Sequence, residues 1–215
     1  MRLPSRVLEP VERISEILFG LIMALTITGA VSVATADRFQ IRTMLIAALG
    51  CNLAWGIIDA GMYLMARIGE RGRNDRLAHA VREATDRDKA HSIIADELPQ
   101  LLASVFQKPQ LELIREKISL MPKGGKVPKL TADDWSGALG VFGLVVLSTF
   151  PVVIPFMVIG DARVALRVSN ALAVIMLFLC GFFFARYAGL NQWVTGLIMV
   201  AVGVALVSIA IALGG

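Results

Sequence analysis

One carboxylate interrupts a long apolar stretch of this sequence. Asp59 lies in CNLAWGIIDAGMYLM (51–65), eight residues before Arg67, which is about 12 Å along an α-helix at roughly 1.5 Å per residue. An aspartate at that depth in a membrane costs about 2.5 to 3.5 kcal/mol if it faces lipid. We therefore expect Asp59 to face other helices or a water-filled cavity.

The helical period predicts further donor groups near this carboxylate. Asn52 lies seven residues before Asp59 and Met62 three residues after it, which predicts a stripe of amide oxygen, carboxylate and thioether. Glu16 and Met23 form a similar face on the preceding apolar segment. Because a thioether suits softer ions than magnesium or calcium, we predict a path for a transition-metal ion between the two segments. The alternative is that Asp59 only hydrogen-bonds to a neighbouring helix and that the methionines pack.

These segments belong to an unusually apolar chain. Of its 215 residues, 56% are hydrophobic and 18% are charged, which indicates a membrane protein rather than a soluble domain. A helix needs roughly 20 mostly apolar residues to cross the hydrocarbon core. Five stretches meet this length: 17–36, 43–66, 136–160, 168–188 and 193–213. Although Ala34-Thr35-Ala36 resembles a signal-peptide cleavage site, the length of the first stretch favours a retained span.

Basic residues are concentrated in one part of the chain. Thirteen of the 21 lysines and arginines lie in 67–135. The positive-inside rule therefore predicts a cytoplasmic N-terminus, a cytoplasmic 67–135 segment and a C-terminus on the opposite side of the bilayer. We predict an all-α, polytopic integral membrane protein with five transmembrane helices. Residues 1–66 carry the first two, 67–135 form a cytoplasmic helical domain, and 136–215 carry the last three.

The cytoplasmic segment is predicted to be helical. Its apolar residues repeat every three or four positions, which predicts one helix from near Asn74 to Pro99. Two further helices are expected to begin at Pro99 and Pro109, each at a first helical position.

Two pairs of residues on the first of these helices have the chemistry of metal ligands. Asp88 and His91 are three residues apart on the apolar stripe, and Glu83 and Asp86 share the opposite face with His79. Carboxylates and imidazoles bind transition metals, so all four are candidate ligands. The alternative is ordinary ion pairing with nearby arginines and lysines.

The third apolar stretch contains two prolines. Pro151 and Pro155 remove backbone hydrogen bonds and are expected to bend the helix, and Ser148 and Thr149 are available to satisfy the freed carbonyls. Such breaks occur where helices move or line a cavity, and also as static kinks.

The two cysteines, Cys51 and Cys180, each lie in an apolar run, so we interpret both as reduced packing residues. The sequence contains no Walker-type glycine loop, no paired-histidine zinc motif, and no histidine near a plausible serine or cysteine nucleophile. We therefore predict neither an enzyme nor an ATP-driven pump. Aromatic residues are not interleaved with the basic segment, so nucleic acid is not an expected partner.

Three segments resemble the vacuolar iron transporter family. FGLIMALTITGAVSVA resembles the family's first span, AGMYLMARIGERG resembles the Gly-Glu-Tyr segment that closes the second, and FPVVIPF resembles the proline-bearing third. The resemblance implies a homodimer that exports Fe²⁺ or Mn²⁺ from the cytosol in exchange for protons, with no permanently bound cofactor. Phe19 stands where the family has its pore aspartate, and Met62 stands where it has a glutamate. Asp59, one helical turn earlier, would supply the missing charge.

The sequence thus predicts a transporter that moves a divalent metal ion, iron or manganese, out of the cytoplasm. Asp59 would coordinate the ion or exchange a proton for it, while Met62, Asn52, Glu16 and Met23 would line its route. The rival from another class is a non-transporting membrane protein whose cytoplasmic helices bind a partner. A carrier of a small organic solute or of protons is a further alternative.

Overall fold

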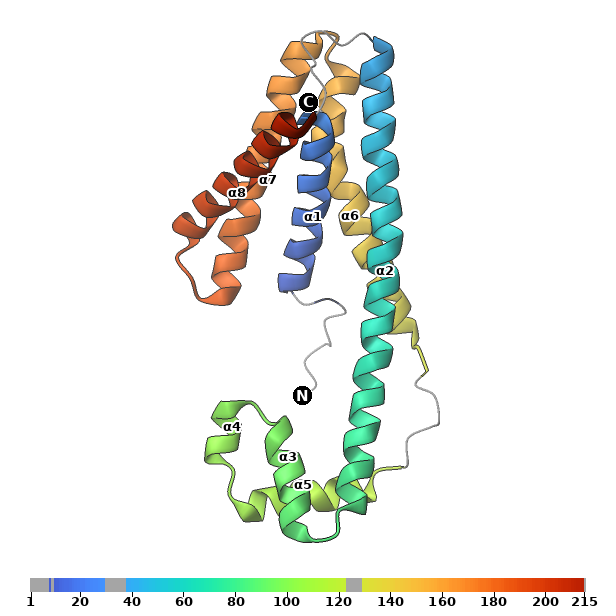
Figure 1. Cartoon of the computed structure of the whole chain (residues 1–215), viewed down its shortest axis with the longest axis vertical. Coiled ribbons are helices and arrows are strands. Elements are labelled where there is room, and N and C mark those ends of the chain that lie inside the picture. The colour runs from blue at the N-terminus through green and yellow to red at the C-terminus, as the bar shows by residue number, and fades with distance from the viewer. Residues whose placement is uncertain (1–7, 9, 30–37, 123–128, 215) are drawn as a thin grey trace. The chain divides into compact units, whose positions relative to one another are not determined.

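The computed structural model describes residues 8, 10–29, 38–122 and 129–214, and these residues form helices without any strand. The prediction of an all-α fold is confirmed for this part of the chain. In chain order the helices are α1 (Pro10–Gly29), α2 (Arg38–Glu83), α3 (Arg87–Glu97), α4 (Gln100–Val105), α5 (Lys108–Leu120), α6 (Ala132–Val158), α7 (Ala162–Ala188) and α8 (Gln192–Gly214) (Figure 1).

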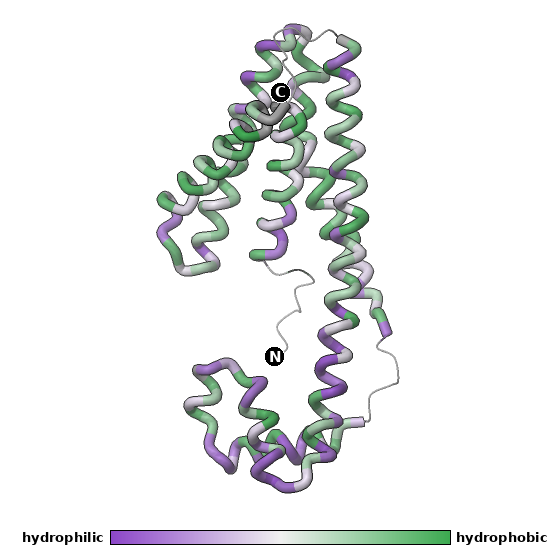
Figure 2. The backbone as a smooth tube through the Cα atoms, in the orientation of Figure 1, coloured by the Kyte–Doolittle hydropathy of each residue, from purple (hydrophilic) through white to green (hydrophobic). Residues whose placement is uncertain are grey.

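Among the described residues, three helices are long and apolar enough to cross a bilayer. They are Phe39–Glu83, Ala132–Val158 and Ala162–Ala188, and Gln192–Leu206 is a shorter apolar helix. Figure 2 shows apolar residues along α6, α7, α8 and the first part of α2, and hydrophilic residues along α3 to α5. These features are those of a membrane protein. The first predicted span is only partly visible, since 30–36 lie outside the described residues.

The chain divides into two compact units. One comprises Met1–Tyr63 and Ala132–Gly215, and the other comprises Leu64–Thr131. The sequence division into 1–66, 67–135 and 136–215 counted the two ends of the chain separately, whereas they belong to one unit.

The core of the first unit lies where α1, α6 and α7 meet. Its buried residues are Leu21, Ala24, Leu25, Val152, Ala173 and Leu177. Helices α7 and α8 pack closely, because a Cβ at Gly181 would lie 2.8 Å from the Thr195 carbonyl oxygen. Gly189, at φ +70°, ends α7 in the left-handed conformation that glycine adopts without steric penalty.

Helix α6 continues through both prolines to Val158. Ser148 Oγ and Thr149 Oγ1 donate to the Val145 carbonyl at 2.7 and 3.4 Å, in the turn before the first proline. They do not reach the carbonyl four residues before either proline, which was their expected role. Ser169 of α7 donates instead to the Val152 carbonyl at 2.7 Å and ties α7 to the proline-containing part of α6.

The second unit differs from the sequence prediction in where its helices begin. The prediction of one helix from Asn74 to Pro99 is wrong, because α2 continues unbroken to Glu83 and α3 begins at Arg87. Asp86 causes the break, since its side chain accepts a hydrogen bond from the Lys89 amide at 2.7 Å and caps α3. Pro99 is the residue before α4 rather than its first residue.

The core of this second unit is formed by Val81 of α2, Ala90 and Ile94 of α3, and Leu111 of α5. Of the apolar stripe that the sequence periodicity identified, Val81 belongs to this buried core, and Leu77, Ala84, Ala95 and Leu98 pack against it partly buried.

Candidate cation site

Two carboxylates on different helices lie within electrostatic range of each other in the first unit. Glu16 of α1 and Asp59 of α2 lie close enough for their charges to interact, and Glu12, one turn before Glu16, contributes to the same field. Both Glu16 and Asp59 are partly buried. Glu16 Oε2 is buried without a hydrogen-bond partner among the described residues. Because like charges repel strongly away from bulk water, this arrangement favours neutralisation of the carboxylates by a proton or a cation.

Asn52, seven residues before Asp59 on α2, joins α2 to both α1 and α6. Its side chain is 1% exposed, and its Nδ2 donates to the Gly20 carbonyl of α1 at 3.1 Å and to Thr149 Oγ1 of α6 at 2.7 Å. Its Oδ1 is buried and has no partner in the part of the chain that the structure describes. A buried polar atom without a partner costs roughly 1 to 3 kcal/mol, so its presence here calls for a reason other than stability.

Gly20 is the residue that allows α1 and α6 to approach each other at this point. A Cβ at Gly20 would lie 2.6 Å from the Val145 carbonyl oxygen and still closer to Ser148 Oγ. Only glycine fits such a contact, and the Gly20 carbonyl is therefore within reach of Asn52.

Two sulfur atoms, those of Cys51 and Met23, lie together at the contact between α1 and α2. Cys51 Sγ lies 3.3 Å from Met23 Sδ, and both residues are partly buried. Cys51 is a free thiol, as the sequence predicted, but it faces α1 rather than only filling space. Nothing in the sequence signals this contact, because it depends on how α1 and α2 are aligned along their axes.

The predicted stripe on α2 is present except for Met62. Asn52 is buried and Asp59 is partly buried. Tyr63, one turn after Asp59, packs against Gly137 of α6. Met62 is 55% exposed. At about 100° per residue, a position three residues after Asp59 is rotated by about 60° from it, whereas one seven residues before is rotated by only about 20°. The side chain of Met62 consequently does not join the contact between α1 and α2.

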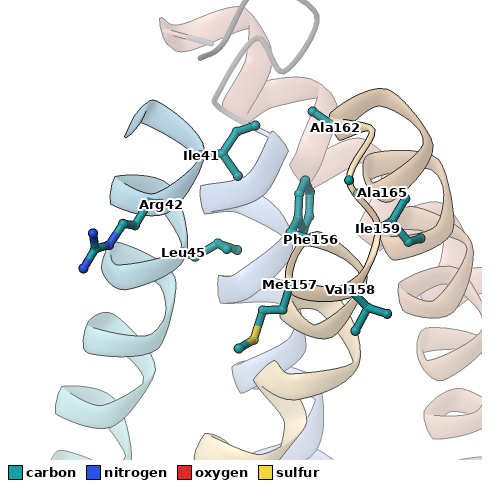
Figure 3. A pocket seen from close by; sticks show the side chains of 10 residues that line it. Ile41, Arg42, Leu45, Phe156, Met157, Val158, Ile159, Ala162 and Ala165 are labelled. Atoms are coloured by element: carbon teal, nitrogen blue, oxygen red, sulfur yellow. The ribbon is translucent and has the colours of Figure 1, made fainter. Parts of the chain in front are cut away.

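The structure also contains a pocket of about 440 Å³ among the ends of α2, α6 and α7 (Figure 3). Phe156 and Met157 contribute to its mainly apolar wall, and Arg42 is the single charged residue among those that line it. Figure 3 shows the guanidinium of Arg42 pointing away from the other labelled side chains. With no carboxylate in its lining and a positive charge beside it, this pocket does not suit a cation.

In the second unit, three of the predicted metal ligands have other partners. Asp88 pairs with Lys108 at 2.8 Å, and the hydrogen bond from Lys108 lowers the pKa of the Asp88 carboxyl below its ordinary value. Glu83 pairs with His79 at 3.1 Å, and Asp86 caps α3. The Asp88 and Glu83 pairs are largely exposed, so each contributes little to stability.

The fourth predicted ligand, His91, is the buried member of an ion-pair network. Its Nε2 lies 2.8 Å from Glu112 Oε2, and Arg115 donates to both oxygens of Glu112 at 3.0 and 2.7 Å. Hydrogen bonds from Arg115 and His91 hold the pKa of Glu112 at about 2, well below its ordinary value. The sequence reasoning missed Glu112, although its spacing of three residues from Arg115 is a recognisable signal. Across the described ranges, no three His, Cys, Asp or Glu side chains gather as a metal site would require.

Comparison with models of known protein families gave no match to this chain. Comparison with curated protein sequences gave no match either. The resemblance to the vacuolar iron transporter family therefore stays a prediction.

Proposed function

We propose that this protein is a transporter that exports a divalent metal ion, Fe²⁺ or Mn²⁺, from the cytoplasm in exchange for protons. The observation that carries the proposal is the pair of carboxylates, Glu16 of α1 and Asp59 of α2, whose charges lie within range of each other. Asp59 lies within the predicted span 43–66, and Glu16 lies directly before the predicted span 17–36. A carboxylate inside a span is expensive and usually marks an ion or proton pathway.

The charge balance of the pair explains how one ion can be exchanged for protons. A divalent cation between Glu16 and Asp59 neutralises both carboxylates, and two protons neutralise them equally well. Since the pair is least favourable when it is fully charged and empty, release of the metal ion favours proton uptake. Protons then compete with the metal ion at the site, which couples the two flows in opposite directions.

One to two helical turns from this pair, the Asn52 side chain blocks the path of an ion between α1 and α2. Its amide fills the space between Gly20 and Thr149 and is 1% exposed. Passage of an ion requires these two hydrogen bonds to break, at a cost of about 0.6 kcal/mol for an average hydrogen bond between membrane helices. Opening is therefore energetically accessible. The prolines at 151 and 155 lie on α6 just after Thr149, where a proline-containing helix can adjust.

The orientation and assembly follow from charge and resemblance. The concentration of lysine and arginine in 67–135 supports a cytoplasmic position for this segment and for the N-terminus, with the C-terminus on the other side. By resemblance to the vacuolar iron transporter family, two copies would form a homodimer within the bilayer. Exposed apolar residues on α2, among them Ile57 and Met62, are available to a second copy or to lipid.

The test is a flux assay with purified protein in liposomes. Mn²⁺ and Fe²⁺ uptake is measured with a trapped metal-sensitive dye, and proton movement is measured with a pH dye in parallel. We expect metal flux with opposing proton flux in wild type, and loss of both in Asp59→Asn. Glu97→Gln, at the exposed end of α3, is the control and should behave as wild type.

A specific observation favours the rival interpretation, a membrane protein whose cytoplasmic helices bind a partner. Large apolar side chains of α5 and the residue after it are exposed, including Leu113 at 59% and Leu120 at 85%. The same flux assay separates the two functions. Absence of flux of any divalent ion in the wild-type protein would support the partner-binding function and end the transport proposal.

A further inference from the structure

Two sulfur atoms from different helices lie together at the contact between α1 and α2. Met23 Sδ and Cys51 Sγ are 3.3 Å apart, and the cysteine is a free thiol. A thioether and a thiolate are soft donors, which select copper(I) and related ions over the harder ions that carboxylates prefer. The second cysteine, Cys180, is buried in α7 and shares no such contact among the described residues.

A buried amide follows the cysteine in the sequence and also bridges α1 and α2. Asn52 follows Cys51 directly, and its Nδ2 donates to the carbonyl of Gly20, one turn before Met23 on α1. The other polar atom of this amide, Oδ1, is buried and has no partner among the described residues. An unsatisfied buried acceptor on the residue next to Cys51 is a second unusual feature of the contact between α1 and α2.

The sulfur pair is distinct from the carboxylate pair. Met23 lies seven residues after Glu16, and Cys51 lies eight residues before Asp59, so the two sets are about 10 to 12 Å apart along their helices. Helices α1 and α2 thus present hard oxygen donors at one level and soft sulfur donors at another.

We propose that Met23 and Cys51 form a binding site for a soft monovalent metal ion of the copper(I) class. The Cys51 thiol loses its proton to water, the thiolate sulfur forms the metal bond, and Met23 donates a sulfur lone pair. The resulting thiolate and metal charges cancel, which suits a site among membrane helices. With metal–sulfur bonds of about 2.3 Å, the zinc–thiolate length, and an angle of about 120° at the metal, the two sulfur atoms lie about 4.0 Å apart. They must therefore separate slightly from the observed 3.3 Å. This site goes beyond the proposed function, because binding at the sulfur pair requires no flux of a divalent ion.

The test is copper(I) binding to the full-length protein in detergent under reducing conditions, measured by competition with a coloured copper(I) chelator. Wild type is expected to bind one copper(I) per chain. Cys51→Ala and Met23→Leu should each weaken binding by about tenfold or more. Two controls carry the same substitutions elsewhere, Cys180→Ala and Met199→Leu, and should bind as wild type. Equal melting temperatures of the five proteins establish that the variants fold.

A second readout follows the cysteine itself. In the Cys180→Ala background, Cys51 is the remaining thiol, and copper(I) should protect it from alkylation by a maleimide. The proposal is overturned if wild type binds no copper(I), if Cys51→Ala or Met23→Leu binds as tightly as wild type, or if copper(I) leaves alkylation unchanged. Manganese flux, and its loss in Asp59→Asn, tests the carboxylate pair alone. Copper(I) binding and thiol protection test the sulfur pair alone, so either proposal can fail without the other.

Discussion

Replacing Asn52 by leucine distinguishes a functional polar contact between α1, α2 and α6 from a merely structural one. The substitution keeps the approximate size of the side chain and removes both of its hydrogen bonds, to Gly20 at 3.1 Å and to Thr149 at 2.7 Å. It also removes the buried Oδ1 that has no partner among the described residues.

The magnitude follows from these two opposing changes. Two hydrogen bonds between membrane helices, at about 0.6 kcal/mol each, amount to a loss of about 1.2 kcal/mol. Removal of the unsatisfied acceptor regains about 1 to 3 kcal/mol. The net effect of Asn52→Leu on the free energy of unfolding is therefore between about zero and 2 kcal/mol of stabilisation.

The assay combines thermal unfolding of the detergent-solubilised protein with metal flux in liposomes. Since about 1 kcal/mol shifts the melting temperature of a chain of this size by roughly 2 to 4 °C, Asn52→Leu should melt at the wild-type temperature or a few degrees above it. Flux should be lost, because the amide lies on the route. Thr149→Val is the contrasting variant and should destabilise, since it leaves the Asn52 amide nitrogen with one acceptor instead of two. A fall of the melting temperature of Asn52→Leu by more than about 6 °C, or an unchanged flux, would refute this reasoning.

Three further outcomes are expected. Gly20→Ala should destabilise the protein by about 1 to 3 kcal/mol in thermal unfolding, because its Cβ would lie 2.6 Å from the Val145 carbonyl oxygen. The control Gly50→Ala should not destabilise it, since a Cβ there meets nothing within 4 Å. Equal effects of the two substitutions would contradict the close approach of α1 and α6. The folded-state pKa of Glu112, about 2, is below its ordinary value of 4.5, so its ion pairs stabilise the protein above pH 4.5 and this contribution disappears as the pH falls towards 2. Melting temperatures measured across that range should fall less steeply in Glu112→Gln than in wild type, and parallel curves would show that the network contributes nothing. Asp88→Asn should melt at close to the wild-type temperature, because its ion pair with Lys108 is exposed to solvent. A clear fall of the melting temperature would contradict this.

The sequence predicted which face of α2 carries the polar groups, because helical periodicity is a property of one segment. Asn52 and Asp59 lie on the face that it indicated. The same reasoning included Met62, which is exposed, because a spacing of three residues deviates further around a helix than a spacing of seven. The contact between Met23 and Cys51 could not be predicted, since it depends on the alignment of two helices and not on either sequence pattern.

The boundaries of the second unit show a different limit. The first charged residues after 66 suggested the end of a span, but charge alone does not end a helix, and α2 continues to Glu83. What ends it is the turn capped by Asp86, a signal that the sequence contains but that the apolar periodicity on both sides obscured. The pairing of His91 with Glu112 likewise required the packing of α3 against α5.

Binding of Mn²⁺ to the purified full-length protein tests most directly whether Glu16 and Asp59 hold one ion together. Dissociation constants are measured for wild type, Glu16→Gln, Asp59→Asn and the double variant. If both carboxylates bind the same ion, each single variant should weaken binding by about tenfold or more, and the double variant should lose much less than the sum of the two effects. Wild-type affinity in the double variant, or two losses that simply add, would contradict a shared cation site between α1 and α2.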